Sequence, residues 1–141
     1  MSELQPVEIL LVEDNDEDAE LALRALKKHH LTNHLTRLAD GAAALDFFFR
    51  DGGPRQQPRV VLLDLKLPKV DGMQVLKELK SRDETRSVPV VMLTSSKEDR
   101  DLDEAYRLGA NSYIVKPVEF DAFVKAVEQL GLYWALLNQR K

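Results

Sequence analysis

Residues 60–64, Val-Val-Leu-Leu-Asp, form a continuous apolar run that ends in a carboxylate. Such a run is typical of a central parallel strand, because that strand is buried on both faces of its sheet. Leu67-Pro68 then interrupts the chain, and residues 71–82 carry apolar side chains at helical spacing. A strand followed by a helix is the repeating unit of α/β proteins. The segment therefore predicts a buried strand whose carboxyl end is Asp64.

The same alternation of strand and helix continues on both sides of this unit. Four further apolar runs predict strands at residues 9–12, 35–38, 88–93 and 112–115. Helical spacing follows each of them, at residues 16–28, 41–50, 98–108 and from about 119 onward. The polar stretch 53–58, Gly-Pro-Arg-Gln-Gln-Pro, is typical of a surface loop. This order predicts an α/β fold, a doubly wound (βα)5 domain around a five-stranded parallel sheet.

The composition restricts the classes of function. The chain has 141 residues, 20 Lys and Arg, 24 Asp and Glu, and a formal net charge of -4 at pH 7. We expect one domain over residues 1–141 and no general attraction for nucleic acid or anionic lipid. The chain has no cysteine, which excludes disulfides and thiolate metal sites. No signal peptide is visible, and no apolar run approaches the roughly 20 residues that span a bilayer. A cytoplasmic protein without a membrane partner is expected.

Charged or hydroxyl side chains follow four of the predicted strands. They are Glu13-Asp14, Asp64, Thr94 and Lys116. Because the carboxyl ends of parallel strands meet at one edge of the sheet, we expect these groups to converge. Two like charges about 4 Å apart repel by roughly 4 kcal/mol at an effective dielectric constant of about 20. A hard divalent cation such as Mg²⁺, together with the ammonium group of Lys116, would relieve that repulsion.

Each group also has a simpler interpretation when taken alone. Residues 13–16, Glu-Asp-Asn-Asp, could only cap a helix, and Thr94 could do the same for the next one. Asp64 could be an ordinary turn residue, and Lys116 an ordinary strand exit. All four at one edge are not expected by chance. The set favours a phosphoryl-accepting site with Asp64 as the nucleophile, because phosphoryl transfer depends mainly on positioning and on neutralised oxygens.

Four segments carry a resemblance to a known family. LLVEDN at 10–15, LLDLKLPKVDG at 62–72, VVMLTSS at 90–96 and YIVKP at 113–117 resemble the signature segments of the response-regulator receiver domain. The resemblance covers about residues 7–130. It implies a flavodoxin-like three-layer sandwich with strand order 2-1-3-4-5. It also implies a single-domain response regulator that takes a phosphoryl group from a sensor histidine kinase and catalyses only its own phosphorylation and dephosphorylation.

The resemblance assigns a metal site. Asp64 would be the phosphoacceptor, and Asp14, Asp64 and the main-chain carbonyl of Lys66 would bind Mg²⁺. Glu13 would join through a water molecule, and Mn²⁺ or Ca²⁺ could replace Mg²⁺ in a crystal. Lys66 lies two residues after Asp64, at a position that varies in the family. Its side chain would affect how water reaches the acyl phosphate.

The resemblance also assigns the switch residues. Lys116 would form an ion pair with the phosphoryl group, and its peptide bond to Pro117 would be cis. Thr94 would move to hydrogen-bond the phosphoryl group, and Tyr113 would be the aromatic residue that turns inward with it. Ser96, two residues after Thr94, is a second kinetic modulator.

The last residues suggest a partner surface. Residues 130–137 are apolar and predict a helical C-terminal extension at about 130–141. An exposed apolar face needs a partner, so Leu130, Tyr133, Trp134 and Leu137 are candidate homodimer contacts. The alternative is a tail that packs on its own domain. This ending resembles small stand-alone response regulators that pair with phytochrome-type sensor kinases. A downstream protein target or a phosphotransfer protein would then receive the signal.

Three other functions remain open at this level. A phosphatase with an aspartyl-phosphate intermediate usually has a second aspartate two residues after the nucleophile, where this chain has Lys66. A receiver-like interaction module that is never phosphorylated would not need the full set Asp14, Asp64, Thr94 and Lys116. A DNA-binding regulator would need a recognition helix or a basic face, and the sequence shows neither.

Overall fold

Five parallel strands form one sheet in the computed structural model, which describes residues 7–32 and 34–132. Their order is β2-β1-β3-β4-β5. This flavodoxin-like order confirms the predicted fold class. The strands are β1 (Ile9–Val12), β2 (Leu35–Leu38), β3 (Val60–Asp64), β4 (Val90–Thr94) and β5 (Ser112–Val115).

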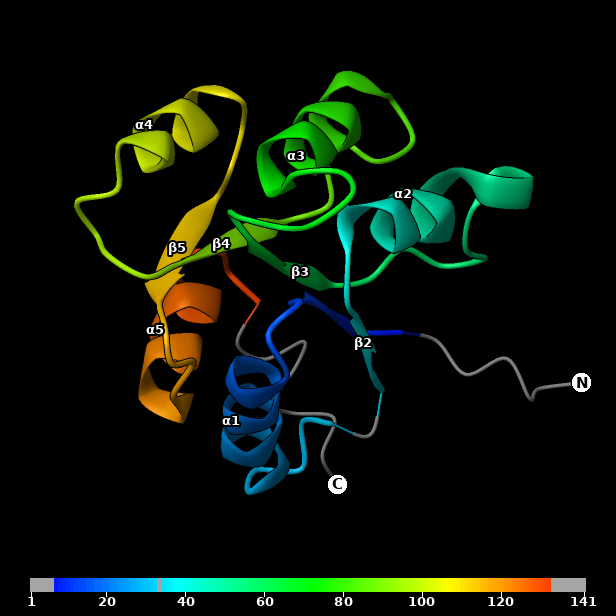
Figure 1. Ribbon diagram of the computed structural model, residues 1–141. Helices are drawn as coiled ribbons and strands as arrows, with labels where there is room; N and C mark the ends of the chain where they lie inside the picture. The colour runs from blue at the N-terminus through cyan, green and yellow to red at the C-terminus, as the bar shows by residue number, and fades with distance from the viewer. Residues whose placement is uncertain (1–6, 33, 133–141) are drawn as a thin grey trace, which may run out of the picture.

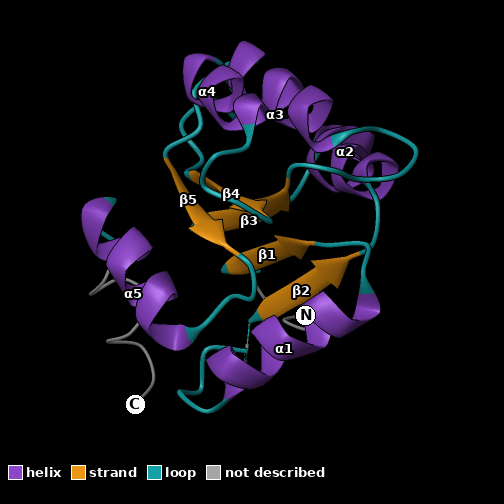
Figure 2. Ribbon diagram, turned by 60° about the vertical axis from the view of Figure 1, so that its left-hand side comes forward, coloured by secondary structure: helices purple, strands orange, loops and turns teal. Residues whose placement is uncertain are grey.

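Helices cover both faces of the sheet and complete the three layers. α1 and α5 lie on one face, and α2, α3 and α4 lie on the other (Figure 1), as the turned view in Figure 2 also shows. None of the helices in the described part of the chain has the length and apolar character that a bilayer span requires. The helices are α1 (Asp16–Lys27), α2 (Gly41–Phe49), α3 (Gly72–Ser81), α4 (Arg100–Arg107) and α5 (Phe120–Gln129), with a short 3-10 helix η1 (Arg50–Gly52) after α2.

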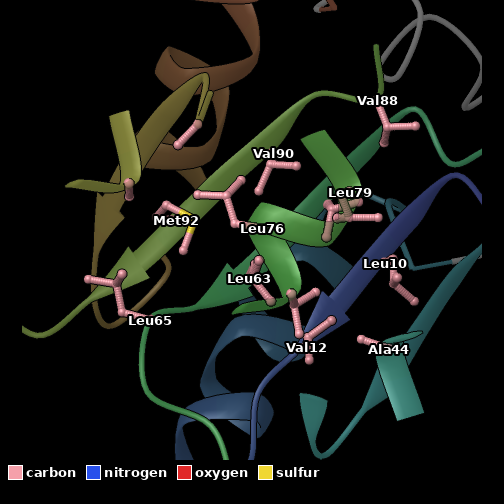
Figure 3. Packing of buried hydrophobic residues seen from close by; sticks show 14 of the residues in the cluster. Leu10, Val12, Ala44, Leu63, Leu65, Leu76, Leu79, Val88, Val90 and Met92 are labelled. Atoms are coloured by element: carbon pink, nitrogen blue, oxygen red, sulfur yellow. The ribbon is translucent and has the colours of Figure 1, made fainter. Parts of the chain in front are cut away.

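The central strands are buried on both faces. Every residue of β1, β3 and β4 is buried, and two apolar clusters lie on opposite sides of the sheet. On the side of α2, α3 and α4, Leu63, Leu76 and Met92 belong to one cluster (Figure 3). Burial of one such side chain contributes about 1.5–3 kcal/mol. The packed sheet is therefore a firm support for the groups at the strand ends.

The helix and strand ends follow from local chemistry. Asn15 caps α1 by accepting a hydrogen bond from the Asp18 amide at 2.8 Å. Asp99 caps α4 in the same way, so this helix begins at Arg100 and not at residue 98. β4 begins at Val90, two residues later than predicted, and the residue before it is Pro89, which has no amide hydrogen to donate to a ladder.

α5 ends before the predicted extension at about 130–141, of which only residues 130–132 are described. α5 ends at Gln129, and Gly131 has a φ of 74°, a backbone conformation common after a helix. Leu130 and Leu132 pack against the apolar cluster between the sheet and the α1–α5 layer. Of the candidate dimer contacts, Tyr133, Trp134 and Leu137 lie outside the described residues.

Candidate functional site

The carboxyl ends of the strands bring the predicted groups together at one edge of the sheet. Lys116, which follows β5, has its Nζ atom 3.0 Å from Asp64 Oδ2 and 3.2 Å from Glu13 Oε1. These residues are 52 and 103 positions away along the chain. The same nitrogen lies 3.1 Å from Asp18 Oδ2. One ammonium group is therefore shared by three carboxylates: Asp64 at the end of β3, Asp18 in α1 and Glu13 in the turn after β1.

Three of the acidic residues form a compact cluster of oxygen donors. Glu13, Asp14 and Asp64 each offer a carboxylate oxygen, and these atoms lie within 4.8 Å of one another. Glu13 and Asp64 are buried and Asp14 is exposed. Burial, followed by a hydrogen bond with Asp64, raises the pKa of Glu13 to about 7. The raised pKa shows that these clustered carboxylates are not all stable in the charged form without a cation. A divalent cation such as Mg²⁺, which prefers hard oxygen ligands, would stabilise their charged forms.

Lys116 remains charged at neutral pH in this setting. Burial alone would lower the pKa of Lys116, but hydrogen bonds to Asp64 and Asp18 and the nearby charge of Glu13 raise it above its usual value overall. The Lys116–Pro117 peptide bond is cis, the isomer that the family resemblance implied. The ammonium group is therefore a fixed positive charge beside Asp64.

A cavity of about 260 Å³ opens over these groups. Its walls include Asp14, Asp64, Lys66, Thr94 and Lys116. Since a water molecule takes about 30 Å³ in the liquid, the cavity has room for a phosphoryl group with several waters. The predicted phosphoacceptor, metal ligands, Thr94 and Lys116 thus line a single space that a small anion can enter, whereas Tyr113 and Ser96 are not among its walls.

Lys66 extends its side chain away from Asp64. Its backbone amide donates to Asp64 Oδ1 at 3.2 Å, but its Nζ atom donates to Asp101 Oδ2 on α4 at 2.6 Å. That hydrogen bond raises the pKa of Lys66 above its usual value. The residue therefore links the turn after β3 to the first turn of α4.

The two switch candidates lie on neighbouring strands, Thr94 as the last residue of β4 and Tyr113 within β5. Thr94 is buried, and its Oγ1 donates to the Ser96 carbonyl at 2.9 Å while accepting from the Ser96 amide at 3.3 Å. Tyr113 is half-buried, and its ring meets the ring of Tyr106 edge to face with centroids 6.4 Å apart. In this arrangement the Thr94 hydroxyl is directed to its own loop.

Two carboxylates that bind lysines of the site were missed by sequence reasoning. Asp18 is the third carboxylate on Lys116, and its place in the first turn of α1, directly after the acidic turn, was a signal that could have found it. Asp101 binds Lys66 across 35 residues of sequence, and no local pattern marks that contact.

Comparison with known proteins agrees with this geometry. The sequence pattern of the response regulator receiver domain matches residues 9–128. The probable methanogenesis regulatory protein FilR2 of Methanothrix harundinacea is 47% identical over 135 residues, which cover 95% of this chain and 87% of that protein.

Two solved structures are similar in fold and sequence. The bacteriophytochrome response regulator AtBRR has a TM-score of 0.83 and 51% identity, with 96% of this chain and 99% of that chain covered. The Mn²⁺-bound form of response regulator Rcp1 has a TM-score of 0.71 and 37% identity, with 92% and 94% covered. The chain therefore belongs to the family of response regulator receiver domains, the signalling modules of two-component systems.

Proposed function

We propose that this receiver domain accepts a phosphoryl group on Asp64 from the phosphohistidine of a sensor histidine kinase. The observation that carries the proposal is the 3.0 Å contact of Lys116 Nζ with Asp64 Oδ2 beside the cluster of Glu13, Asp14 and Asp64. Lys116 offsets part of the negative charge around Asp64, a divalent cation at the cluster would offset more of it, and Asp64 lines the open cavity. The signal would then pass through changed protein contacts.

The chemistry assigns a separate task to each side chain. A carboxylate oxygen of Asp64 forms a bond to phosphorus as the phosphorus–nitrogen bond of the donor breaks, and the electron pair stays on the imidazole nitrogen. Lys116 binds an oxygen of the transferred group. Thr94 exchanges its hydrogen bond with the Ser96 carbonyl for one with another phosphoryl oxygen, and Tyr113 follows it inward. The domain would catalyse only its own phosphorylation and dephosphorylation.

Mg²⁺ is the cofactor that we propose for this reaction. Asp14, Asp64 and the main-chain carbonyl of Lys66 would hold the ion, and Glu13 would join through a water molecule. Mg²⁺ suits a site with few protein ligands, because it keeps several of its waters and engages phosphate oxygens. When bound, the ion supplies positive charge to the phosphoryl oxygens. The Mn²⁺-bound form of Rcp1 supports a divalent cation in a relative.

The proposed kinase partner follows from a relative of known role. A phytochrome-type sensor kinase is the proposed donor, since AtBRR is a bacteriophytochrome response regulator at 51% identity. A downstream protein target or a phosphotransfer protein would receive the signal in the cytoplasm.

A homodimer is the proposed assembly of this single domain of residues 1–141. Leu130 packs against its own core, which leaves Tyr133, Trp134 and Leu137 as the main candidate contacts. Sedimentation equilibrium at tens of micromolar is expected to give the mass of two chains, and a monomeric mass would contradict the dimer.

Metal-dependent labelling tests the proposed function. The full chain is incubated with acetyl phosphate in excess Mg²⁺ and, in parallel, with a chelator, and the intact mass is measured. We expect one phosphoryl group per chain with Mg²⁺ and none with the chelator, because charge neutralisation at the carboxylates is needed for attack. If neither acetyl phosphate nor phosphoramidate labels the chain in excess Mg²⁺, a receiver-like interaction module without phosphorylation becomes the better description.

Lys66 and Ser96 are the proposed modulators of the lifetime of the phosphorylated state.

The ion pair of Lys66 with Asp101 is expected to contribute little to stability. The side chains are 68% and 45% exposed, and exposed ion pairs contribute no more than about 1 kcal/mol. A double-mutant cycle with Lys66→Met and Asp101→Asn, measured by urea unfolding, should give a coupling energy below that value, and added salt should reduce it. A weak pair would let a phosphoryl group compete with Asp101 for Lys66. A coupling of several kcal/mol would show that Lys66 is not available.

A further inference from the structure

Arg37 on the edge strand β2 reaches the turn that carries the acidic cluster. Its Nε and Nη2 atoms donate to the main-chain carbonyl oxygen of Glu13, at 2.9 and 2.7 Å. Its Nη1 atom lies 3.0 Å from Asp16 Oδ1, and the Arg37 side chain is 25% exposed. A planar guanidinium group with several donors in a fixed fork can hold both groups at once. Arg37 thus connects β2 with the beginning of α1.

The contact acts on the peptide group between two members of the cluster. The Glu13 carbonyl belongs to the peptide that joins Glu13 to Asp14, and that peptide is planar. Holding its oxygen therefore restricts the orientation of the Asp14 backbone. The Glu13 amide donates to the Leu38 carbonyl at 2.9 Å, so Glu13 is bound to β2 through both its amide and its carbonyl.

The turn is also fixed on the far side of Asp14. The Asn15 amide donates to Glu13 Oε2 at 3.1 Å, and the Asn15 side chain caps α1 through the Asp18 amide. Within residues 7–32 and 34–132, no hydrogen bond or ion pair holds the Asp14 carboxylate itself. The place of this carboxylate beside Asp64 therefore depends on the backbone that Arg37 holds.

Arg37 has two effects on a bound cation, and they have opposite signs. Its positive charge repels a divalent ion, which lowers affinity, and its ion pair with Asp16 offsets only part of that repulsion. Its hydrogen bonds to Glu13 hold the Asp14 backbone in place, which raises affinity. Whether Mg²⁺ affinity falls or rises when Arg37 is replaced shows which effect dominates.

We infer that Arg37 is a positioning residue for the metal site, which holds the Glu13–Asp14 peptide so that Asp14 joins Asp64 at the cation. The inference rests on the proposed function, because Mg²⁺ is the ion in question. It adds a residue from β2, a strand that contributes no ligand.

The test compares Arg37→Met with Arg24→Met in the full chain. Arg24 on α1 pairs with Glu20 at 3.1 Å, so its loss makes the same change in charge without touching the acidic turn. Calorimetric titration at constant ionic strength should give Mg²⁺ binding that is about 10- to 100-fold weaker in Arg37→Met and unchanged in Arg24→Met. Hydrogen exchange of the amides at residues 14–18 should be faster only in Arg37→Met.

A third variant separates charge from geometry. Arg37→Lys keeps the charge but has no guanidinium fork, so its Mg²⁺ affinity should lie well below that of the unmodified chain. Urea unfolding shows whether each variant is folded, and Arg37→Lys decides the question if Arg37→Met is not. Unchanged or tighter Mg²⁺ binding in the folded variants would overturn the inference and leave the proposed function intact. Absence of Mg²⁺ binding in the unmodified chain would instead overturn the proposed function, and this inference with it.

Discussion

Asp64→Asn is expected to abolish phosphoryl transfer to the chain and to leave the domain folded. The amide of asparagine is a poor nucleophile, so the oxygen that attacks phosphorus is lost. Intact mass after incubation with acetyl phosphate and Mg²⁺ should show labelling of the unmodified chain and only background in the variant.

The fold should tolerate Asp64→Asn because the substitution removes a repulsion as well as an attraction. Lys116 keeps Glu13 and Asp18 as partners, at 3.2 and 3.1 Å. Glu13 no longer faces a second buried carboxylate, and the asparagine carbonyl can still accept a hydrogen bond from Lys116. Far-ultraviolet circular dichroism should therefore match that of the unmodified chain.

Asp99→Asn is the matched control for Asp64→Asn. Asp99 lines the same cavity, but its carboxylate caps α4 and is not a member of the three-residue cluster. Labelling should persist in this variant. Equal labelling of Asp64→Asn and the unmodified chain would place the phosphoryl group on another residue.

The strand ends could be predicted because their signals are local. The apolar runs that end at Asp64 and Thr94 identify buried strands, and parallel strands bring their carboxyl ends to one edge. The convergence of Lys116 with Glu13 and Asp64 follows from that rule, and the structure adds which of their atoms meet. Sequence could therefore place the main groups of the site without knowing any distance.

The contacts that tune the site could not be predicted, because they depend on side-chain reach between elements. In the sequence, Arg37 is one polar position in a short edge strand, and no neighbouring residue indicates that its side chain donates to the Glu13 carbonyl in another loop. Lys66 and Asp101 meet only because the turn after β3 and the first turn of α4 lie side by side. Away from the site, the half-buried Lys80 shows the same dependence on side-chain reach, since it donates hydrogen bonds to the Arg86 and Val88 carbonyls at the opposite end of the sheet.

Gly72 is another position whose role depends on close approach, and Gly72→Ala is expected to damage both the fold and the site. A Cβ atom there would lie 2.0 Å from the Asp64 carbonyl oxygen and 2.8 Å from the Leu65 carbonyl oxygen. Both neighbours are backbone, so no side-chain rotation can relieve the overlap. Either the first turn of α3 or the segment 65–71 must move. We expect a loss of about 2–3 kcal/mol in the free energy of unfolding, since overpacking typically costs about 1–3 kcal/mol.

The displacement should also slow phosphoryl transfer, because the segment that moves carries Lys66 and adjoins Asp64. A misplacement of about 1 Å can reduce a rate by about 100-fold, so labelling by acetyl phosphate should slow at least about 10-fold in folded Gly72→Ala. Gly52→Ala is the control: a Cβ there meets nothing within 4 Å, and its φ of 86° costs only about 1–2 kcal/mol. Urea unfolding shows that both variants are folded, and the labelling rate separates them, because only Gly72→Ala displaces the segment beside Asp64. A Gly72→Ala protein with the stability of the unmodified chain and normal labelling would show that α3 can shift without disturbing Asp64.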